Sequence, residues 1–305
     1  MFLFAVGFSV RGDLVVALKN LYKKIAQFDA VIIETTGLAD PAPVAQTFFV
    51  DDYIKERFSL DGIITVCDVR HIIARLDDVK PEGVENEAEE QVAFADRILL
   101  NKTDLAKDEA EMVAIEARLR KMNPSAQIYR TQQSVCDPAL LIGISAFDLD
   151  RTLEMDENFL NTDEEHEHDP SVSSTSTRFE GYLQIQKLQR WIGTILRTMG
   201  ANLFRYKGVL NVAGMNRKFV FQGVGMLFSG DFVEEVWAPG AKRENCFVFI
   251  GRDLDKKALI DGFMACKCSD VLRFAVGDMV LANVGPSVST AGADGYALGK
   301  IVRQW

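Results

Sequence analysis

The first half of the chain alternates between two hydrophobic patterns. Helical spacing is seen in Leu14, Leu18 and Leu21, and the same spacing predicts helices over 85–95 and 109–122. Short continuous apolar runs separate these stretches, and they lie at 30–33, 62–67, 97–100 and 126–129. Short apolar strands between amphipathic helices are typical of a parallel sheet covered on both faces. We therefore expect an α/β domain over 1–147, with ligands at the carboxyl ends of its strands.

The composition changes between residues 148 and 177. This segment is rich in Asp, Glu, Ser and Thr and has no basic residue from Thr152 to Thr177, which predicts a solvated linker. The pattern after it predicts a smaller α+β domain over 178–268 and a β-hairpin-like extension over 269–305. The elements expected in that smaller domain are helices over 183–199 and 254–265 and strands over 206–213, 217–223 and 246–250.

Composition and charge narrow the classes of partner. The chain has 305 residues, of which 48% are hydrophobic, and a net charge of -10, so it has no general electrostatic attraction for nucleic acid or anionic lipid. No apolar run is long enough to span a bilayer, and five scattered cysteines do not form a disulfide framework. We therefore expect a cytoplasmic or organellar protein with no nucleic acid and no membrane among its partners.

A candidate base-recognition loop follows the apolar run at 97–100. The carboxylate of Asp104 can accept hydrogen bonds from both N1 and N2 of guanine, whereas adenine offers no such pair of donors. Asn101 would brace the loop and reach the edge of the base, and the aliphatic stem of Lys102 would lie over the ring. The alternative is an Asn turn at the end of a strand, with Asp104 capping the next helix.

A second candidate loop follows the apolar run at 30–33. Glu34 stands where an acidic residue can hold Mg²⁺, directly or through water, and Gly37 lets a backbone N–H approach a γ-phosphate. The alternative is a strand-to-helix turn with Asp40 or Thr36 as the cap and Pro41 at the first helical position. The two interpretations are compatible.

Together with further strings, these loops resemble the CobW family of metal-chaperone GTPases. The resemblance runs from about residue 9 to residue 268 and crosses both predicted domains in order. The strings that carry it are ETTGLADPAPVAQTFF (34–49), CDVRHIIARLDD (67–78), EEQVAFADRILLNKTDL (89–105), LFRYKGVLNVAG (203–214), KFVFQGVGMLF (218–228) and VFIGRDLDKKAL (248–259).

The resemblance implies a GTPase domain coupled to a CobW-type C-terminal domain. GTP and Mg²⁺ would be the cofactors, Zn²⁺ or a related ion the cargo, and a client metalloprotein the partner. Asn101, Lys102 and Asp104 would then bind guanine, and Glu34 and Gly37 would serve the Mg²⁺ and γ-phosphate side.

The sequence also departs from the family pattern. No segment fits the phosphate loop G-x-x-x-x-G-K-[ST], and Ala5, Gly7 and Phe8 stand where the family carries a Cys-x-Cys-Cys metal motif. We interpret the first domain as an incomplete parallel-sheet GTPase domain that begins too late. Its missing strand would lie centrally and leave two unpaired edges. The alternative is a degenerate, non-hydrolysing paralogue that acts as a binding or regulatory partner.

His166 and His168 lie in the linker with five acids between residues 163 and 169. Imidazole and carboxylate groups bind borderline divalent cations, so a weak metal site is one interpretation. A solvated acidic tether is the other, and composition favours it.

The missing phosphate loop leads to a prediction for the chain 1–305. We expect a dissociation constant for GTP weaker than about 100 µM and no hydrolysis above the buffer rate, because most phosphate contacts and the lysine charge are lost. Calorimetry and phosphate release measure both quantities. GTP turnover that disappears in Asp104→Ala would contradict the prediction.

Overall fold

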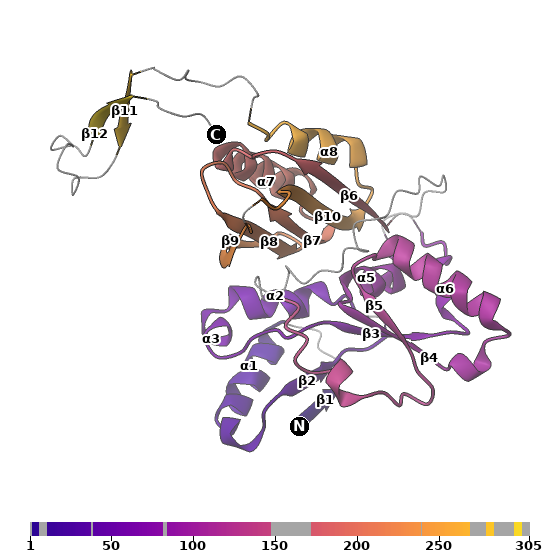
Figure 1. The fold of residues 1–305 in the computed structure, drawn as a ribbon. Coiled ribbons are helices and arrows are strands. Elements are labelled where there is room, and N and C mark those ends of the chain that lie inside the picture. Colours follow the sequence, from indigo (N-terminus) through magenta and orange to yellow (C-terminus); the bar gives the residue numbers. More distant parts are fainter. Residues whose placement is uncertain are drawn as a thin grey trace. The chain divides into compact units, whose positions relative to one another are not determined.

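The computed structural model describes residues 2–5, 11–37, 39–81, 84–147, 172–238, 240–268, 279–283 and 296–300. The chain forms two compact units, residues 1–267 and residues 268–305. In the second unit, strands β11 (Met279–Asn283) and β12 (Tyr296–Lys300) pair antiparallel, as expected for a hairpin. All further elements belong to the first unit (Figure 1).

The N-terminal part of the first unit is α/β, and the predicted fold class is confirmed. Its strands are parallel, and the helices predicted over 85–95 and 109–122 are α5 and α6. The strands are β1 (Phe2–Ala5), β2 (Val31–Glu34), β3 (Ile64–Asp68), β4 (Arg97–Asn101) and β5 (Gln127–Arg130). The helices are α1 (Arg11–Tyr22), α2 (Ala42–Val50), α3 (Asp52–Lys55), α4 (Ile72–Leu76), α5 (Glu87–Phe94) and α6 (Glu109–Met122), with short 3-10 turns η1 (Ile25–Gln27), η2 (Thr103–Leu105) and η3 (Pro138–Leu140).

The parallel strands fall into two sheets, β1–β2 and β3–β4–β5. Within the described part of the chain, no strand pairs with the second edge of β2 or with the outer edge of β3. The central strand β4 buries Ile98 and Leu100 completely, whereas Val66 of β3 is 60% exposed and β2 has no fully buried residue. Among the described strands, one edge of β2 and one edge of β3 are therefore unpaired.

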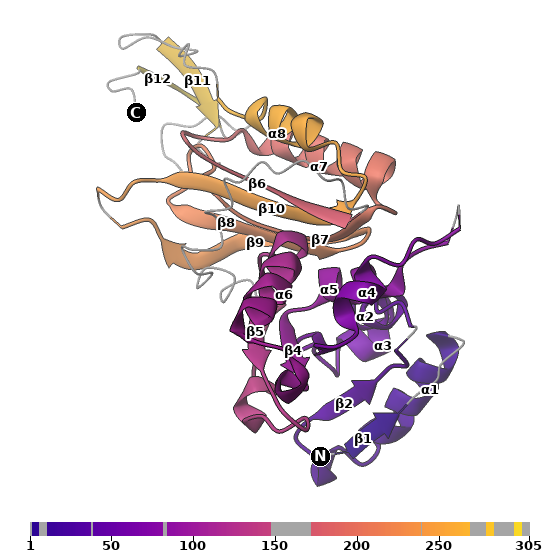
Figure 2. The same cartoon turned by 90° about the vertical axis from the view of Figure 1, so that its right-hand side faces the viewer.

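The C-terminal part is a five-stranded antiparallel sheet with two helices on one face (Figure 2). Residues 172–177, which the composition placed in the linker, belong to its strand β6, and β9 was not predicted. The strand order is β6–β10–β7–β8–β9. The elements are β6 (Val172–Glu180), α7 (Ile185–Met199), β7 (Leu203–Leu210), β8 (Arg217–Val224), β9 (Leu227–Val236), β10 (Glu244–Arg252) and α8 (Lys256–Met264).

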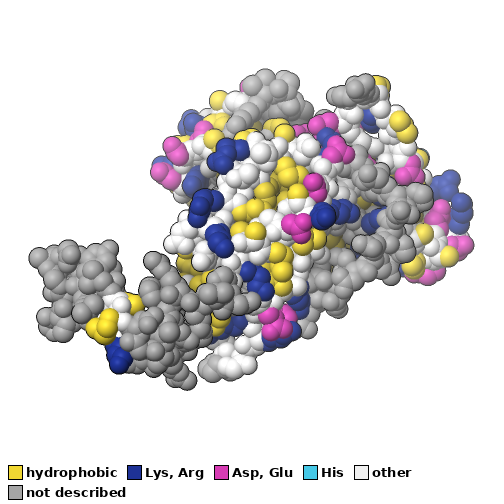
Figure 3. All heavy atoms as spheres, turned by 90° about the horizontal axis from the view of Figure 1, so that it is seen from above, with side chains coloured by type: hydrophobic (Ala, Val, Ile, Leu, Met, Phe, Trp, Pro, Cys, Tyr) yellow, Lys and Arg dark blue, Asp and Glu magenta, His cyan; other side chains and the backbone are white. Residues whose placement is uncertain are grey.

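The two faces of this sheet are covered differently. Beneath α7 and α8 lies an aromatic cluster in which the rings of Phe247 and Phe263 are 4.6 Å apart. On the other face, Phe204 lies 5.5 Å from Phe94 of α5, and the two parts share one hydrophobic core. The outer face of α7 and α8 shows Lys and Arg side chains beside an apolar patch (Figure 3), and α7 contains no acidic residue. The sheet is thus a middle layer between two sets of helices.

A buried ion pair joins the two parts. Arg205 of β7 donates to the carboxylate of Asp96 and, at 2.8 Å, to the carbonyl of Phe94. Asp96 also accepts the backbone N–H of Ile63 at 2.9 Å, just before β3. The side chains of Arg205 and Asp96 are only 2% and 6% exposed, and Lys207, 4.0 Å from Asp96, is a second and more distant cation, so Arg205 supplies the closest compensation of the buried carboxylate.

The segment before the predicted linker strengthens this junction. The Asp61 carboxylate accepts the three backbone N–H groups of 143–145 at 2.7 to 3.1 Å. Lys207 and Gln222 of the C-terminal sheet donate to the carbonyls of 146–147. Residues 143–147 therefore connect the start of β3 to β7 and β8.

We expect Arg205→Met to lower the free energy of unfolding by about 3 to 5 kcal/mol, because it leaves the Asp96 charge buried without its partner. Urea denaturation followed by tryptophan fluorescence measures the change. The control is Arg178→Met, which removes a half-exposed pair with Glu244 in the same sheet and should cost at most about 1 kcal/mol. If both variants lost the same free energy of unfolding, the claim that burial makes the Arg205 pair more costly to break would be wrong.

Candidate functional site

Polar side chains lie together at the carboxyl ends of β3 and β4. Asp68, the last residue of β3, is in register with Asn101, the last residue of β4. The Nζ atom of Lys102 donates to Oδ2 of Asp68 at 2.6 Å. Asp68 was not among the predicted site residues, although its position directly after the apolar run 62–67 was a signal for it.

Asn101, at the end of β4, is hydrogen-bonded to the loop that follows β5. Its Oδ1 accepts from the hydroxyl of Thr131 at 3.1 Å and from the backbone N–H of Ser134 at 3.0 Å. Its Nδ2 donates to Oγ of Ser134 at 2.9 Å. The residue is 6% exposed, so the amide is held in one orientation. These bonds connect the end of β4 to the loop after β5, and the role expected of Asn101 toward a base stays a prediction.

Asp68 is a permanent anion that fixes Lys102. Burial raises the pKa of Asp68, but hydrogen bonds from Lys102, the backbone N–H of Arg70 and His71 outweigh burial and lower it to about 2. Lys102 itself has a left-handed backbone, with φ of 61°. The ion pair therefore holds the stem of Lys102 at the point where the chain leaves β4.

Asp104, unlike Asp68, has a carboxylate that is not held by hydrogen bonds from the described residues. It is exposed in η2, and its carboxylate makes no hydrogen bond to the residues that the structure describes. The cap of α6 is Asp108, whose side chain accepts the N–H of Glu111 at 2.8 Å. Asp104 is therefore not engaged as a helix cap and is available as an acceptor.

The loop after β2 contains one residue that caps helix α2 and two candidate residues that are exposed. Oδ1 of Asp40 accepts the N–H of Ala42 at 2.7 Å, so Asp40 stabilises the start of α2. Glu34 and Gly37 are exposed, and a Cβ added at Gly37 would meet open space. No contact among the described residues joins Glu34 or Gly37 to the loop from Asn101 to Asp104. The structure thus presents two separate groups of candidate residues.

Three carboxylates and one arginine surround the start of α5. Arg252, at the end of β10, lies 2.7 Å from Glu85 and 3.2 Å from Glu90. Burial, a hydrogen bond with Glu85 and the nearby Asp40 raise the pKa of Glu90 to about 8, although Arg252 acts in the other direction. Glu90 is therefore protonated near neutral pH. Burial likewise raises the pKa of Asp40 above its ordinary value.

The predicted metal ligands are not described. His166 and His168 lie outside the residues that the structure describes. Among those residues, no group of three or more His, Cys, Asp and Glu side chains could hold a metal ion. None of the described helices is long and apolar enough to cross a bilayer.

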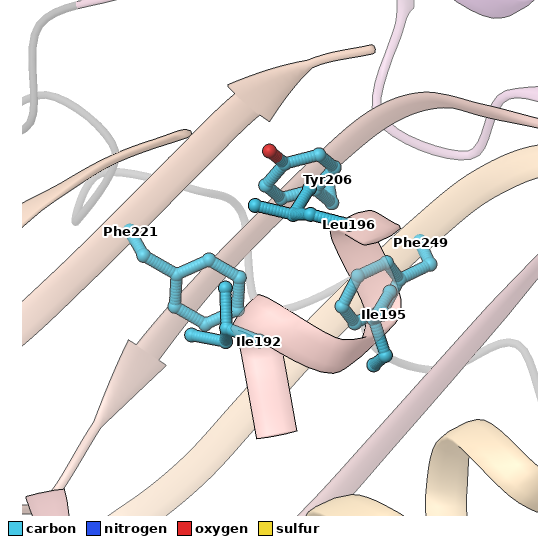
Figure 4. A pocket seen from close by; sticks show the side chains of 6 residues that line it. All are labelled: Ile192, Ile195, Leu196, Tyr206, Phe221 and Phe249. Atoms are coloured by element: carbon cyan, nitrogen blue, oxygen red, sulfur yellow. The ribbon is translucent and has the colours of Figure 1, made fainter. Parts of the chain in front are cut away.

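A small pocket in the C-terminal sheet is no candidate for chemistry (Figure 4). Its only polar lining group is the hydroxyl of Tyr206, which already donates to the carbonyl of Leu227 at 2.6 Å. The remaining lining residues are Ile192, Ile195, Leu196, Phe221 and Phe249. The pocket therefore belongs to the core beneath α7.

Comparison with known proteins identifies the family. Residues 6–130 match the CobW/HypB/UreG nucleotide-binding domain, and residues 172–267 match the cobalamin synthesis protein cobW C-terminal domain. The zinc chaperone YjiA of Escherichia coli is 32% identical over 246 residues, which are 81% of this chain and 73% of YjiA. The chain belongs to the CobW family. The resemblance drawn from the sequence is confirmed.

Other CobW-family relatives carry related names. The zinc-regulated GTPase metalloprotein activator 1 of Schizosaccharomyces pombe is 28% identical over 72% of this chain and 59% of its own length. The crystal structure of Zn(II)-bound YjiA GTPase from E. coli matches with a TM-score of 0.70 and 31% identity, covering 84% of this chain and 76% of YjiA.

The protonation of Glu90 leads to a prediction. Its pKa is 4.5 ordinarily and about 8 in the folded protein, so the folded state binds more protons than the unfolded state. This contribution to stability is complete below about pH 4.5 and is lost as the pH rises to about 8. Urea midpoints should therefore fall over this range. In Glu90→Gln the fall should be smaller, whereas Glu109→Gln, at a 70% exposed carboxylate, should follow the parent. If the urea midpoints of Glu90→Gln and of the parent fell equally with pH, the raised pKa of Glu90 would be contradicted.

Proposed function

We propose that this CobW-family protein is a metallochaperone that couples GTP binding and hydrolysis, with Mg²⁺, to the transfer of Zn²⁺ or a related divalent ion to a client metalloprotein. The observation that carries the proposal is the contrast after β4, where Asn101 at the strand end is tied to the loop after β5 and the carboxylate of Asp104 is unengaged. The names of the relatives, zinc chaperone and zinc-regulated GTPase, support the cargo and the nucleotide. We propose a cytoplasmic location.

In this proposal the loop after β4 selects guanine. Asp104 accepts from N1 and N2 of the base, since an ionised carboxylate has two oxygens and no competing donor. Lys102, tied to Asp68, supplies an aliphatic stem for the ring face. Asn101 keeps the loop in place, because a buried amide with three hydrogen bonds cannot easily rotate.

Glu34 and Gly37 serve the phosphate side in the same proposal. A strand that carries a phosphate loop and pairs in parallel with the free edges of β2 and β3 would satisfy both edges and lie beside Glu34. The printed sequence has no G-x-x-x-x-G-K-[ST] segment. Transcript sequencing upstream of the Met1 codon decides between this arrangement and the non-hydrolysing paralogue: an in-frame phosphate loop supports the GTPase.

The metal and domain assignments stay predictions. We retain His166 and His168 as weak Zn²⁺ ligands in a mostly acidic tether. We also retain the division into 1–147, 148–177, 178–268 and 269–305 as a functional one, with the C-terminal domain meeting the client.

In a form of the protein that carries a phosphate loop, we expect Asp104→Asn to lower the affinity for GTP by about 2 to 4 kcal/mol. The amide replaces one acceptor oxygen with an NH₂ group that faces a donor of the base. Calorimetry with GTP and with ATP measures the effect, and Asp108→Asn, at the cap of α6, is the control that should keep the parent's affinity. Equal affinity of the parent for GTP and ATP would refute the assignment of the loop.

A further inference from the structure

Two arginines of the C-terminal sheet bind opposite ends of α5. Arg205 binds the carbonyl of Phe94 and the carboxylate of Asp96 at its C-terminal end. Arg252 binds Glu85, just before the helix, and Glu90 in its first turn. The helix is therefore connected to the sheet at two points, through Arg205 at its end and through Arg252 at its start.

The same helix contacts the loop between Glu34 and Asp40. Nε2 of Gln91 donates to the carbonyl of Ala39 at 2.9 Å. Glu90, the preceding residue, lies 3.2 Å from Arg252, and the nearby Asp40 raises the pKa of Glu90. Adjacent residues of α5 thus connect the loop to the C-terminal sheet.

The two arginine contacts differ in burial. The pair of Arg205 and Asp96 is 2% and 6% exposed, whereas Arg252 is 16% exposed and its partner Glu85 is 59% exposed. An ion pair in contact with water is weaker and exchanges partners more readily than a buried one. The contact between Arg252 and Glu85 is therefore the one that can rearrange, whereas Glu90, the other partner of Arg252, is only 4% exposed.

We propose that Arg252 is a positioning residue that couples the conformation of the Glu34–Asp40 loop to the C-terminal sheet. The contacts run from Arg252 to Glu90, and from the neighbouring Gln91 to the carbonyl of Ala39 in the loop. On the sheet, the guanidinium carbon of Arg252 lies over the ring of Phe204, 5.3 Å from its centre. A nucleotide-linked role rests on the proposed function, but the contact itself does not.

Hydrogen exchange of the nucleotide-free chain 1–305 tests this coupling. The readout is the exchange rate of the amides of Ala39, Ala42 and Ala45, which are hydrogen-bonded to the loop or to the first turn of α2. Arg252→Met removes the guanidinium and its charge while keeping an unbranched side chain, and we expect these amides to exchange at least about threefold faster. Arg252→Lys keeps the charge and should restore most of the protection.

Two comparisons distinguish a local effect on the loop from a general loss of stability. Amides of α6 should be unchanged, because a general loss of stability would speed them as well, and Arg178→Met should leave the loop amides at the parent rate. Unchanged loop exchange in Arg252→Met, or an equal rise in α6 or in the control, would overturn the coupling. The readout needs no nucleotide, so failure of the GTP assay contradicts the proposed function and not this coupling.

Discussion

The ion pair between Arg205 and Asp96 is the constraint on which the joint structure of residues 1–267 depends. Asp96 receives the N–H of Ile63 before β3 and the guanidinium of β7, so one carboxylate holds both the parallel sheet and the antiparallel one. Burial makes the pair costly to break, because either charge alone would be left in an apolar core. The position of α5 between the two parts follows from it.

Around this fixed junction, the candidate site divides into held and free side chains. Asn101 and Lys102 are held, by Thr131, Ser134 and Asp68, whereas Asp104, Glu34 and Gly37 are exposed. Such a division suits ligand binding, because bracing residues fix the loop and unengaged groups remain for the ligand. The edges of β2 and β3 that no described strand pairs with are the other open feature.

Local patterns predicted the regular elements well. The helix predicted over 109–122 is α6, because its apolar residues recur at helical spacing, although the cap is Asp108 and not Asp104. β6 was missed because its Ser and Thr residues resemble a linker in composition, and only pairing with β10 makes them a strand. β9 was missed because an edge strand carries exposed carboxylates and lacks regular alternation.

The sequence by itself determined the family, the α/β order of the first part and the residues of both loops, because these depend on residue type and spacing along the chain. Only the tertiary structure decided that Asp68 holds Lys102 and that burial, Glu85 and Asp40 raise the pKa of Glu90. Each of these depends on groups distant in sequence that share a small volume, such as Arg252 and Glu90. Burial and charge act through space, and no local pattern encodes which charges will meet.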